Sequence, residues 1–137
     1  MGFDNAIVPS LRLINLIPEL VTVFSCQGHP EREDYDAYLL LAATDLTVAW
    51  ALYELFREAY REQTIGEPVL GFTLETYLVP VKPLLMNVYY PAVVIRWHPT
   101  DYVDVMTYTR ALEMATTQYL VKNNIELPNK LCPWDNF

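Results

Sequence analysis

Two helix starts of the same kind limit the fold more than any other feature of the chain. Each is a threonine followed by an aspartate, at residues 44–45 and 100–101, and each comes after two β-rich segments. We expect the threonine hydroxyl to be the N-cap, which accepts a hydrogen bond from the first helical turn, and the carboxylate of the aspartate to lie at the positive end of the helix dipole. The order therefore predicts two successive strand–strand–helix units.

The helices that follow these starts are expected to cover about residues 45–63 and 101–121. Apolar residues recur at every third or fourth position in both, so each helix has one stripe to bury. The first stripe is Val48, Leu52, Leu55, Phe56 and Ala59, and the second is Val105, Tyr108, Leu112, Ala115 and Tyr119. Gly66 is the expected C′ residue after the first helix, and Lys122 lies at the negative pole of the second.

Four β-strands are predicted around Cys26, Leu40, Leu74 and Val94, where β-branched and aromatic residues gather. The predicted bounds are 19–24, 37–43, 69–79 and 88–98, with a turn at 25–30, a charged loop at 31–36 and a break at 80–83. An α+β fold follows: a mainly antiparallel four-stranded sheet with helices packed on one face, in the order α-ββα-ββα. The order of the strands within the sheet stays open.

A short helix is expected before the first strand. Ser10 can cap it, and Pro18 should end it because proline blocks the continuing hydrogen-bond ladder. Residues 125–137 form a tail with aromatic side chains, which we expect to pack on the domain. The 137 residues then make one domain, 1–137, long enough to bury a core without a metal or a disulfide.

The charge balance argues against several classes of function. The chain has 17 acidic and 9 basic side chains and a formal net charge of −8, whereas a nucleic-acid binder needs a basic stripe.

The apolar run from Tyr38 to Phe56 contains Asp45 and Glu54 and changes from strand to helix period, so no membrane partner is expected. Two cysteines and no secretory signal predict a cytoplasmic protein, of the producing or the host cell.

The segment from Ser25 to His29 has a composition that packing does not explain. Small, polar and nucleophilic side chains follow the first strand there, in the order Ser25, Cys26, Gln27, Gly28 and His29. Glycine lets a ligand approach the backbone, successive N–H groups of a turn can bind an anion, and histidine titrates near neutral pH. The simpler interpretation is a tight turn with a packed cysteine and a surface histidine, and both interpretations stay open.

The same segment resembles a signature of small phage and bacterial proteins, Thr-x-x-Ser-Cys-x-Gly-His after a short helix. The matching positions are Thr22, Ser25, Cys26, Gly28 and His29. It is similar, more distantly, to the Ser-Cys-Ser-Gly-Arg motif of the methyltransferase family that supplies the third protein of tRNA wybutosine modification. There, Gln27 replaces a serine and His29 replaces the arginine. The resemblance covers the first third of the chain and implies a shared site location more than a shared reaction.

A second candidate site lies at the end of the last strand. Alternation places Arg96 and His98 on one face of it, just before a helix N-terminus, which suits an anion. The alternative is an arginine paired with acidic neighbours and a histidine at a strand end. His29 and His98 both precede a proline, so we expect the two segments to lie at one edge of the sheet.

Metal binding and cysteine chemistry would use the same residues. Cys26, His29, His98 and Cys132 would make a Cys₂His₂ set, but only one pair has the short spacing of a zinc site. We therefore expect no stoichiometric zinc, and no cofactor. Cys26 and His29 are also the candidate catalytic residues of a nucleophilic enzyme, although no acidic residue can be assigned to orient the histidine.

The sequence favours a non-enzymatic protein that binds a small anionic, nucleotide-like ligand. The expected ligand-binding residues are Thr22, Ser25, Cys26, Gln27, Gly28, His29, Arg96 and His98. The resemblance also implies a phage-type protein that sequesters a host signal and thereby has an anti-defence role. The alternatives are an acidic inhibitor that imitates nucleic acid on a host protein, and an enzyme. The 10 tyrosines suit a homo-oligomer interface, although such residues more often complete a small core.

Overall fold

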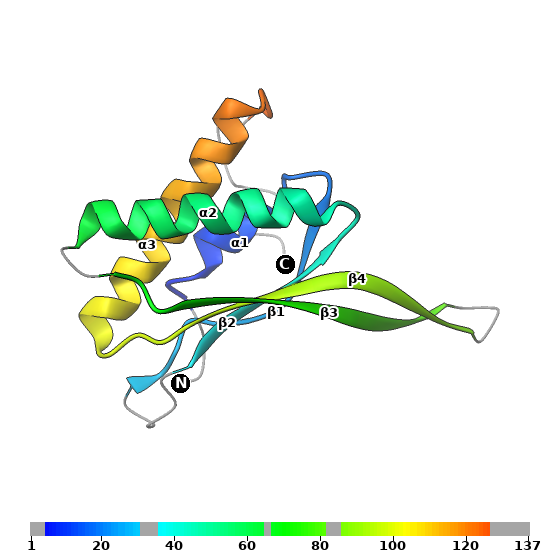
Figure 1. Cartoon of the computed structure of the whole chain (residues 1–137), viewed down its shortest axis with the longest axis horizontal. Coiled ribbons are helices and arrows are strands. Elements are labelled where there is room, and N and C mark those ends of the chain that lie inside the picture. The colour runs from blue at the N-terminus through cyan, green and yellow to red at the C-terminus, as the bar shows by residue number, and fades with distance from the viewer. Residues whose placement is uncertain (1–4, 31–35, 65–66, 82–85, 127–137) are drawn as a thin grey trace.

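The computed structural model describes residues 5–30, 36–64, 67–81 and 86–126, with the backbone alone for 77–81 and 86–90. Its elements follow one another as helix, two strands, helix, two strands and helix (Figure 1). They are α1 (Val8–Ile14), β1 (Leu20–Cys26), β2 (Ala37–Ala43), α2 (Leu46–Gln63), β3 (Leu70–Val81), β4 (Met86–Trp97) and α3 (Tyr102–Lys122). This is the predicted α-ββα-ββα order.

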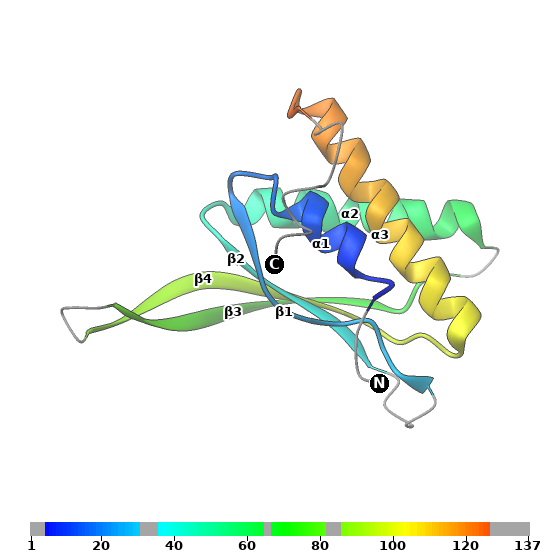
Figure 2. The ribbon, with the colours of Figure 1, turned by 180° about the vertical axis from the view of Figure 1, so that it is seen from behind.

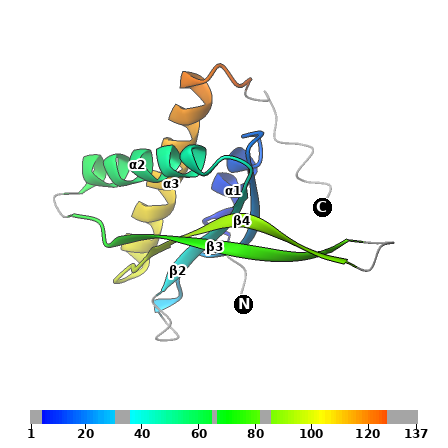
Figure 3. The same cartoon turned by 45° about the vertical axis from the view of Figure 1, so that its right-hand side comes forward.

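The four strands form one antiparallel sheet in the order β1-β2-β4-β3. All three helices lie on one side of this sheet, as the opposite views in Figures 1 and 2 show. The predicted α+β class, antiparallel sheet and one-sided helices are therefore confirmed. β2 pairs with residues 92–97 of β4, so in the described part of the chain no third strand accompanies the far half of the β3–β4 hairpin, which extends beyond the helices (Figure 3).

The core lies between the helices and one face of the sheet. Alternate residues of the two central strands are buried there, with Leu39 and Leu41 opposite Ile95 and Val93. The predicted stripe of α3 is buried throughout. In α2 the stripe is buried at Leu52, Phe56 and Ala59, and partly buried against the core at Val48 and Leu55.

Aspartate, and not threonine, caps both long helices. The side chain of Asp45 accepts hydrogen bonds from the N–H and the hydroxyl of Thr47, at 3.0 and 2.6 Å. Asp101 accepts one from the N–H of Asp104 at 2.8 Å. The Thr-Asp pairs thus mark the helix starts as predicted, but the expected threonine cap is wrong because each helix begins one residue later.

Replacing Asp45 with alanine is expected to lower stability at neutral pH and to have less effect in acid. Hydrogen bonds from the Thr47 hydroxyl, then from its backbone, hold the pKa of Asp45 below its ordinary value. The unfolded chain therefore binds this proton more tightly than the folded protein. The stabilisation is present above the ordinary pKa of about 4 and disappears as the pH falls through the lower folded-state value. Thermal melts of both proteins at neutral pH and near roughly pH 2 test this, and an unchanged difference in Tm would contradict it.

Three details of the predicted segments are wrong. β1 continues through Ser25 to Cys26, so the turn is shorter than expected. Pro80 lies inside β3 where a break was predicted, which a strand at the edge of a sheet tolerates. Ser10 is not a cap, because it lies inside α1 and its hydroxyl donates a hydrogen bond to the carbonyl oxygen of Thr109 at 3.3 Å.

Some predictions fall on residues outside the described ranges. These are the Gly66 cap, most of the charged loop at 31–36, and residues 127–137 of the tail. Ile125, at the beginning of the tail, packs partly buried against the core. Among the described helices, none is long and apolar enough to cross a membrane.

Candidate functional site

The ends of β1 and β4 lie at the same end of the sheet. Both strands are antiparallel to β2, which lies between them, so they run in the same direction. The register pairs Cys26 with Tyr38, Tyr38 with Arg96, and Arg96 with Gly71. Because paired residues of antiparallel strands point to the same face, these four residues form one row across the sheet. The register therefore brings the ends of β1 and β4, which precede the two candidate histidines, to one end of the sheet.

This row lies on the sheet face that the helices leave open. Ile95 and Trp97 are buried on the helix side, so Arg96 between them points to the opposite face. Neighbouring strands are about 4.8 Å apart, which separates the backbones of Cys26 and Arg96 by about 10 Å. Tyr38 lies between them. The place of Tyr38 in this row could not be predicted from the sequence, because it depends on the order of the strands.

Arg96 lines an open hollow of about 260 Å³ together with Gly71, Asp36 and His98. Nδ1 of His98 lies 2.9 Å from Oδ1 of Asp36, so these two exposed side chains form a hydrogen-bonded pair. The guanidinium of Arg96 makes no hydrogen bond or ion pair with any residue in the described ranges. A carbon atom added to Gly71 would meet no other atom within 4 Å, so there is room beside the arginine.

The turn after β1 is held by hydrogen bonds of its own. Oε1 of Gln27 accepts hydrogen bonds from the backbone N–H groups of Ala6 and Ile7 at 2.9 and 3.2 Å, which fixes the chain as it enters α1. Gly28 is buried and has a φ of 92°, a value that other residues rarely adopt. His29 is only 8% exposed. Gln27 and Gly28 thus have structural reasons to be present.

Thr22 and Ser25 lie apart from the open row. The N–H of Thr22 donates to Oδ1 of Asn15 at 2.9 Å, which ties β1 to the end of α1. The register sets Ser25 opposite Leu39, which is buried under the helices, so Ser25 faces the core side. Of the predicted site residues, the structure places three at the open end of the sheet: Cys26, Arg96 and His98.

Within the residues that the structure describes, no three His, Cys, Asp or Glu side chains lie close enough together to hold a metal ion. Cys132, the fourth member of the zinc set considered above, is outside those residues. Cys26 is partly buried at the end of its strand.

A second polar cluster, which the sequence did not indicate, lies where α2 ends and α3 begins. The hydroxyl of Tyr60 donates to Oδ1 of Asp104 at 2.7 Å, and its ring stacks on Tyr108 with 4.1 Å between centroids. Oδ2 of Asp104 accepts from the N–H of Thr100 at 2.9 Å. Burial, and then the bond to Asp104, raises the pKa of Tyr60, and burial raises that of Tyr108.

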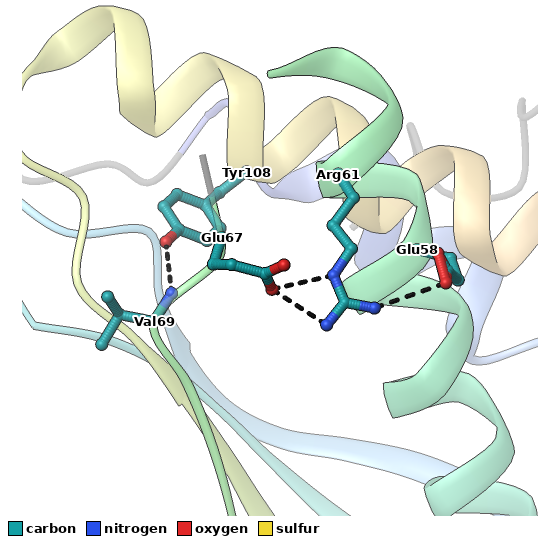
Figure 4. A network of polar contacts seen from close by, with 5 residues as sticks. All are labelled: Glu58, Arg61, Glu67, Val69 and Tyr108. Carbon is teal, nitrogen blue, oxygen red and sulfur yellow. Dashed lines mark hydrogen bonds and ion pairs between the residues drawn. The ribbon is translucent and has the colours of Figure 1, made fainter. Parts of the chain in front are cut away.

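The cluster borders a hollow of about 540 Å³, which His98 also lines. On its rim the Tyr108 hydroxyl accepts a hydrogen bond from the N–H of Val69 at 3.1 Å (Figure 4). Arg61 bridges Glu67 at 2.9 Å and Glu58 at 3.4 Å in the same view. Because its polar groups bind one another, we interpret this cluster as the joint between the two long helices.

Comparison with protein-family models, with curated proteins and with solved structures found no match. The resemblance of the 22–29 segment therefore stays a prediction. The function has to be argued from the open end of the sheet.

Proposed function

We propose that the protein is a non-enzymatic binder of a small anionic, nucleotide-like ligand, with Arg96 as the principal contact. The observation that carries this proposal is the exposed guanidinium of Arg96, which lies at an open hollow without a described partner. Although the chain has 17 acidic and only 9 basic side chains, Arg96 pairs with none of the described carboxylates. The planar fork of arginine pairs with a phosphate or carboxylate through two parallel hydrogen bonds.

The neighbours of Arg96 suit a ligand that has a planar part as well as a charge. Tyr38 is next to it in the cross-strand row and offers an aromatic ring for stacking. Gly71, on the other side, leaves space for the ligand. The imidazole of His98, paired with Asp36, supplies a polar rim. Sequestration of a nucleotide-like signal in the cytoplasm is the role that we propose for such a site.

Replacing Arg96 with alanine should weaken ligand binding roughly tenfold to a hundredfold, because a hydrogen bond to a charged group contributes about 1.5–3 kcal/mol. Isothermal titration with a panel of nucleoside mono-, di- and triphosphates, and with the uncharged nucleosides, measures this loss. Cys26→Ser should leave binding nearly unchanged, since the proposal assigns the sulfur no chemistry.

The matched control is Arg110→Ala on α3. Arg110 is also exposed and has no described ion pair, but it lies on a helix away from the open sheet face. The Arg110→Ala variant should bind the nucleotide panel as the parent protein does. Equal losses from the two arginine variants would show a nonspecific charge effect, and a parent protein that binds no member of the panel would refute the proposal.

A further inference from the structure

The two edge strands of the sheet are protected to different degrees. β1 carries a bulge, since its register with β2 shifts between Thr22 and Phe24, and the N–H of Thr22 is already bound by Asn15. Bulges and covered backbone groups are the usual means by which proteins prevent an edge strand from pairing with another chain. The edge of β1 is therefore less suited to an added strand than a regular, uncovered edge.

The edge of β3 has neither a register shift nor a backbone N–H bound by a side chain in the part of the strand whose side chains are described. Its register with β4 is unbroken from Leu70 to Val81, and no described strand pairs with its outer side. Residues 73–76 are exposed on both faces of the sheet. A regular, uncovered edge offers a row of backbone N–H and C=O groups to an added strand.

Apolar side chains accompany this edge on the helix side. The register sets Phe72 opposite Ile95 and Leu74 opposite Val93, both core residues. The ring of Trp50 on α2 meets that of Phe72 edge to face, with 5.1 Å between centroids. Trp50 is nevertheless 48% exposed and Leu74 is 63% exposed. We call Trp50, Phe72, Thr73, Leu74 and Glu75 the β3-edge surface.

We propose that the β3-edge surface binds an extended, basic segment of a partner protein, which pairs with β3 as an additional strand. Backbone hydrogen bonds along β3 supply affinity in this mode of recognition, and pockets for alternate side chains supply specificity. Alternate apolar side chains of the added strand would cover Leu74 and the exposed part of Trp50. None of these five residues lines the hollow at Arg96, so the proposal does not depend on the anion site.

Charge decides between a basic partner and a second copy of this chain. Glu75 is the one charged side chain on the described part of β3, and it has no ion pair there. The register sets Glu75 opposite Ala92, on the face away from α2, and the arginines of α2 have contacts of their own: Arg57 lies 6.0 Å from the ring centroid of Tyr53, and Arg61 binds two glutamates. A second copy would bring the same net charge of −8, whereas a basic segment would neutralise part of it.

Selection from a library of random peptides displayed on phage, with the full chain as bait, tests this proposal. The selected sequences should alternate apolar and basic residues. A synthetic copy of the most enriched peptide should slow amide exchange at residues 72–76. Leu74→Lys should weaken its binding about tenfold or more, because it removes an exposed apolar contact and adds a charge that repels the peptide.

Val21→Lys is the matched control, since Val21 is 57% exposed on the opposite edge strand. It should bind the peptide as the parent does. If Leu74→Lys does not fold, Trp50→Ala replaces it, with the same expected loss of peptide binding. Failure to enrich basic alternating sequences would overturn the proposal, and so would equal losses from both edge variants. A dimer in light scattering that Leu74→Lys dissociates would also overturn it, because the edge would then belong to a second copy.

Discussion

Replacing Phe56 with alanine is expected to lower the free energy of unfolding by about 3–5 kcal/mol. Phe56 is fully buried, and its ring meets Trp97 edge to face at 5.3 Å and Tyr108 at 6.2 Å between centroids. It thereby joins α2 to β4 and to α3. Truncation removes its buried surface and leaves a cavity that three elements must close. Urea unfolding followed by circular dichroism measures the change.

Phe24→Ala is the matched control for the same chemical change at an exposed site. Phe24 is 56% exposed on β1, so its removal should cost about 1 kcal/mol or less. Equal losses from the two phenylalanine variants would contradict the core that we assign to Phe56.

Local signals explain why the helices and the fold class could be predicted. The stripes of α2 and α3 repeat with helical period, and an aspartate stands at the start of each helix. β2 alternates strictly between buried and half-buried residues before the period changes at Asp45. Each of these signals is contained in a short window, so no knowledge of distant contacts is needed.

The errors come from interactions that join distant parts of the chain. Ser10 was expected to act within its own helix, but its hydroxyl binds Thr109, 99 positions away. Proline at position 80 predicts a break in the strand, but Pro80 fits inside β3 because that strand is at the edge of the sheet. The amide oxygen of Gln27 likewise binds the backbone N–H groups of Ala6 and Ile7, 21 and 20 positions away, which no local pattern indicated.

The candidate site, too, combines features that the sequence could predict with features that depend on distant parts of the chain. Residue types alone pointed to the segment at 25–29 and to Arg96, and the register places Cys26 and Arg96 in one row. The strand order β1-β2-β4-β3, which no local pattern carries, decides that Tyr38 lies between them and Gly71 beyond. For the same reason the sequence could not indicate which edge of the sheet is open.

Replacing Gly28 with valine is expected to destabilise the protein by on the order of 2–5 kcal/mol. Gly28 is buried and has a φ of 92°, which a β-branched residue adopts only under strain. The strain falls on the turn whose Gln27 fixes the entry to α1. Thermal melts should show a lower Tm, and binding of the nucleotide panel should be lost together with the fold at the end of β1.

Gly71→Val is the matched control, and it should separate the site from the fold. Gly71 lies in a strand, where valine is favoured, and an added carbon meets no atom within 4 Å, so stability should be unchanged or rise by up to about 1 kcal/mol. Its new methyl groups would nevertheless stand beside Arg96 in the hollow and take up the space proposed for the ligand. We therefore expect weaker anion binding from a protein that melts no earlier than the parent. A Gly71→Val protein that binds the panel normally would place the ligand elsewhere, and a Gly28→Val protein with unchanged Tm would contradict the strain assigned to the turn.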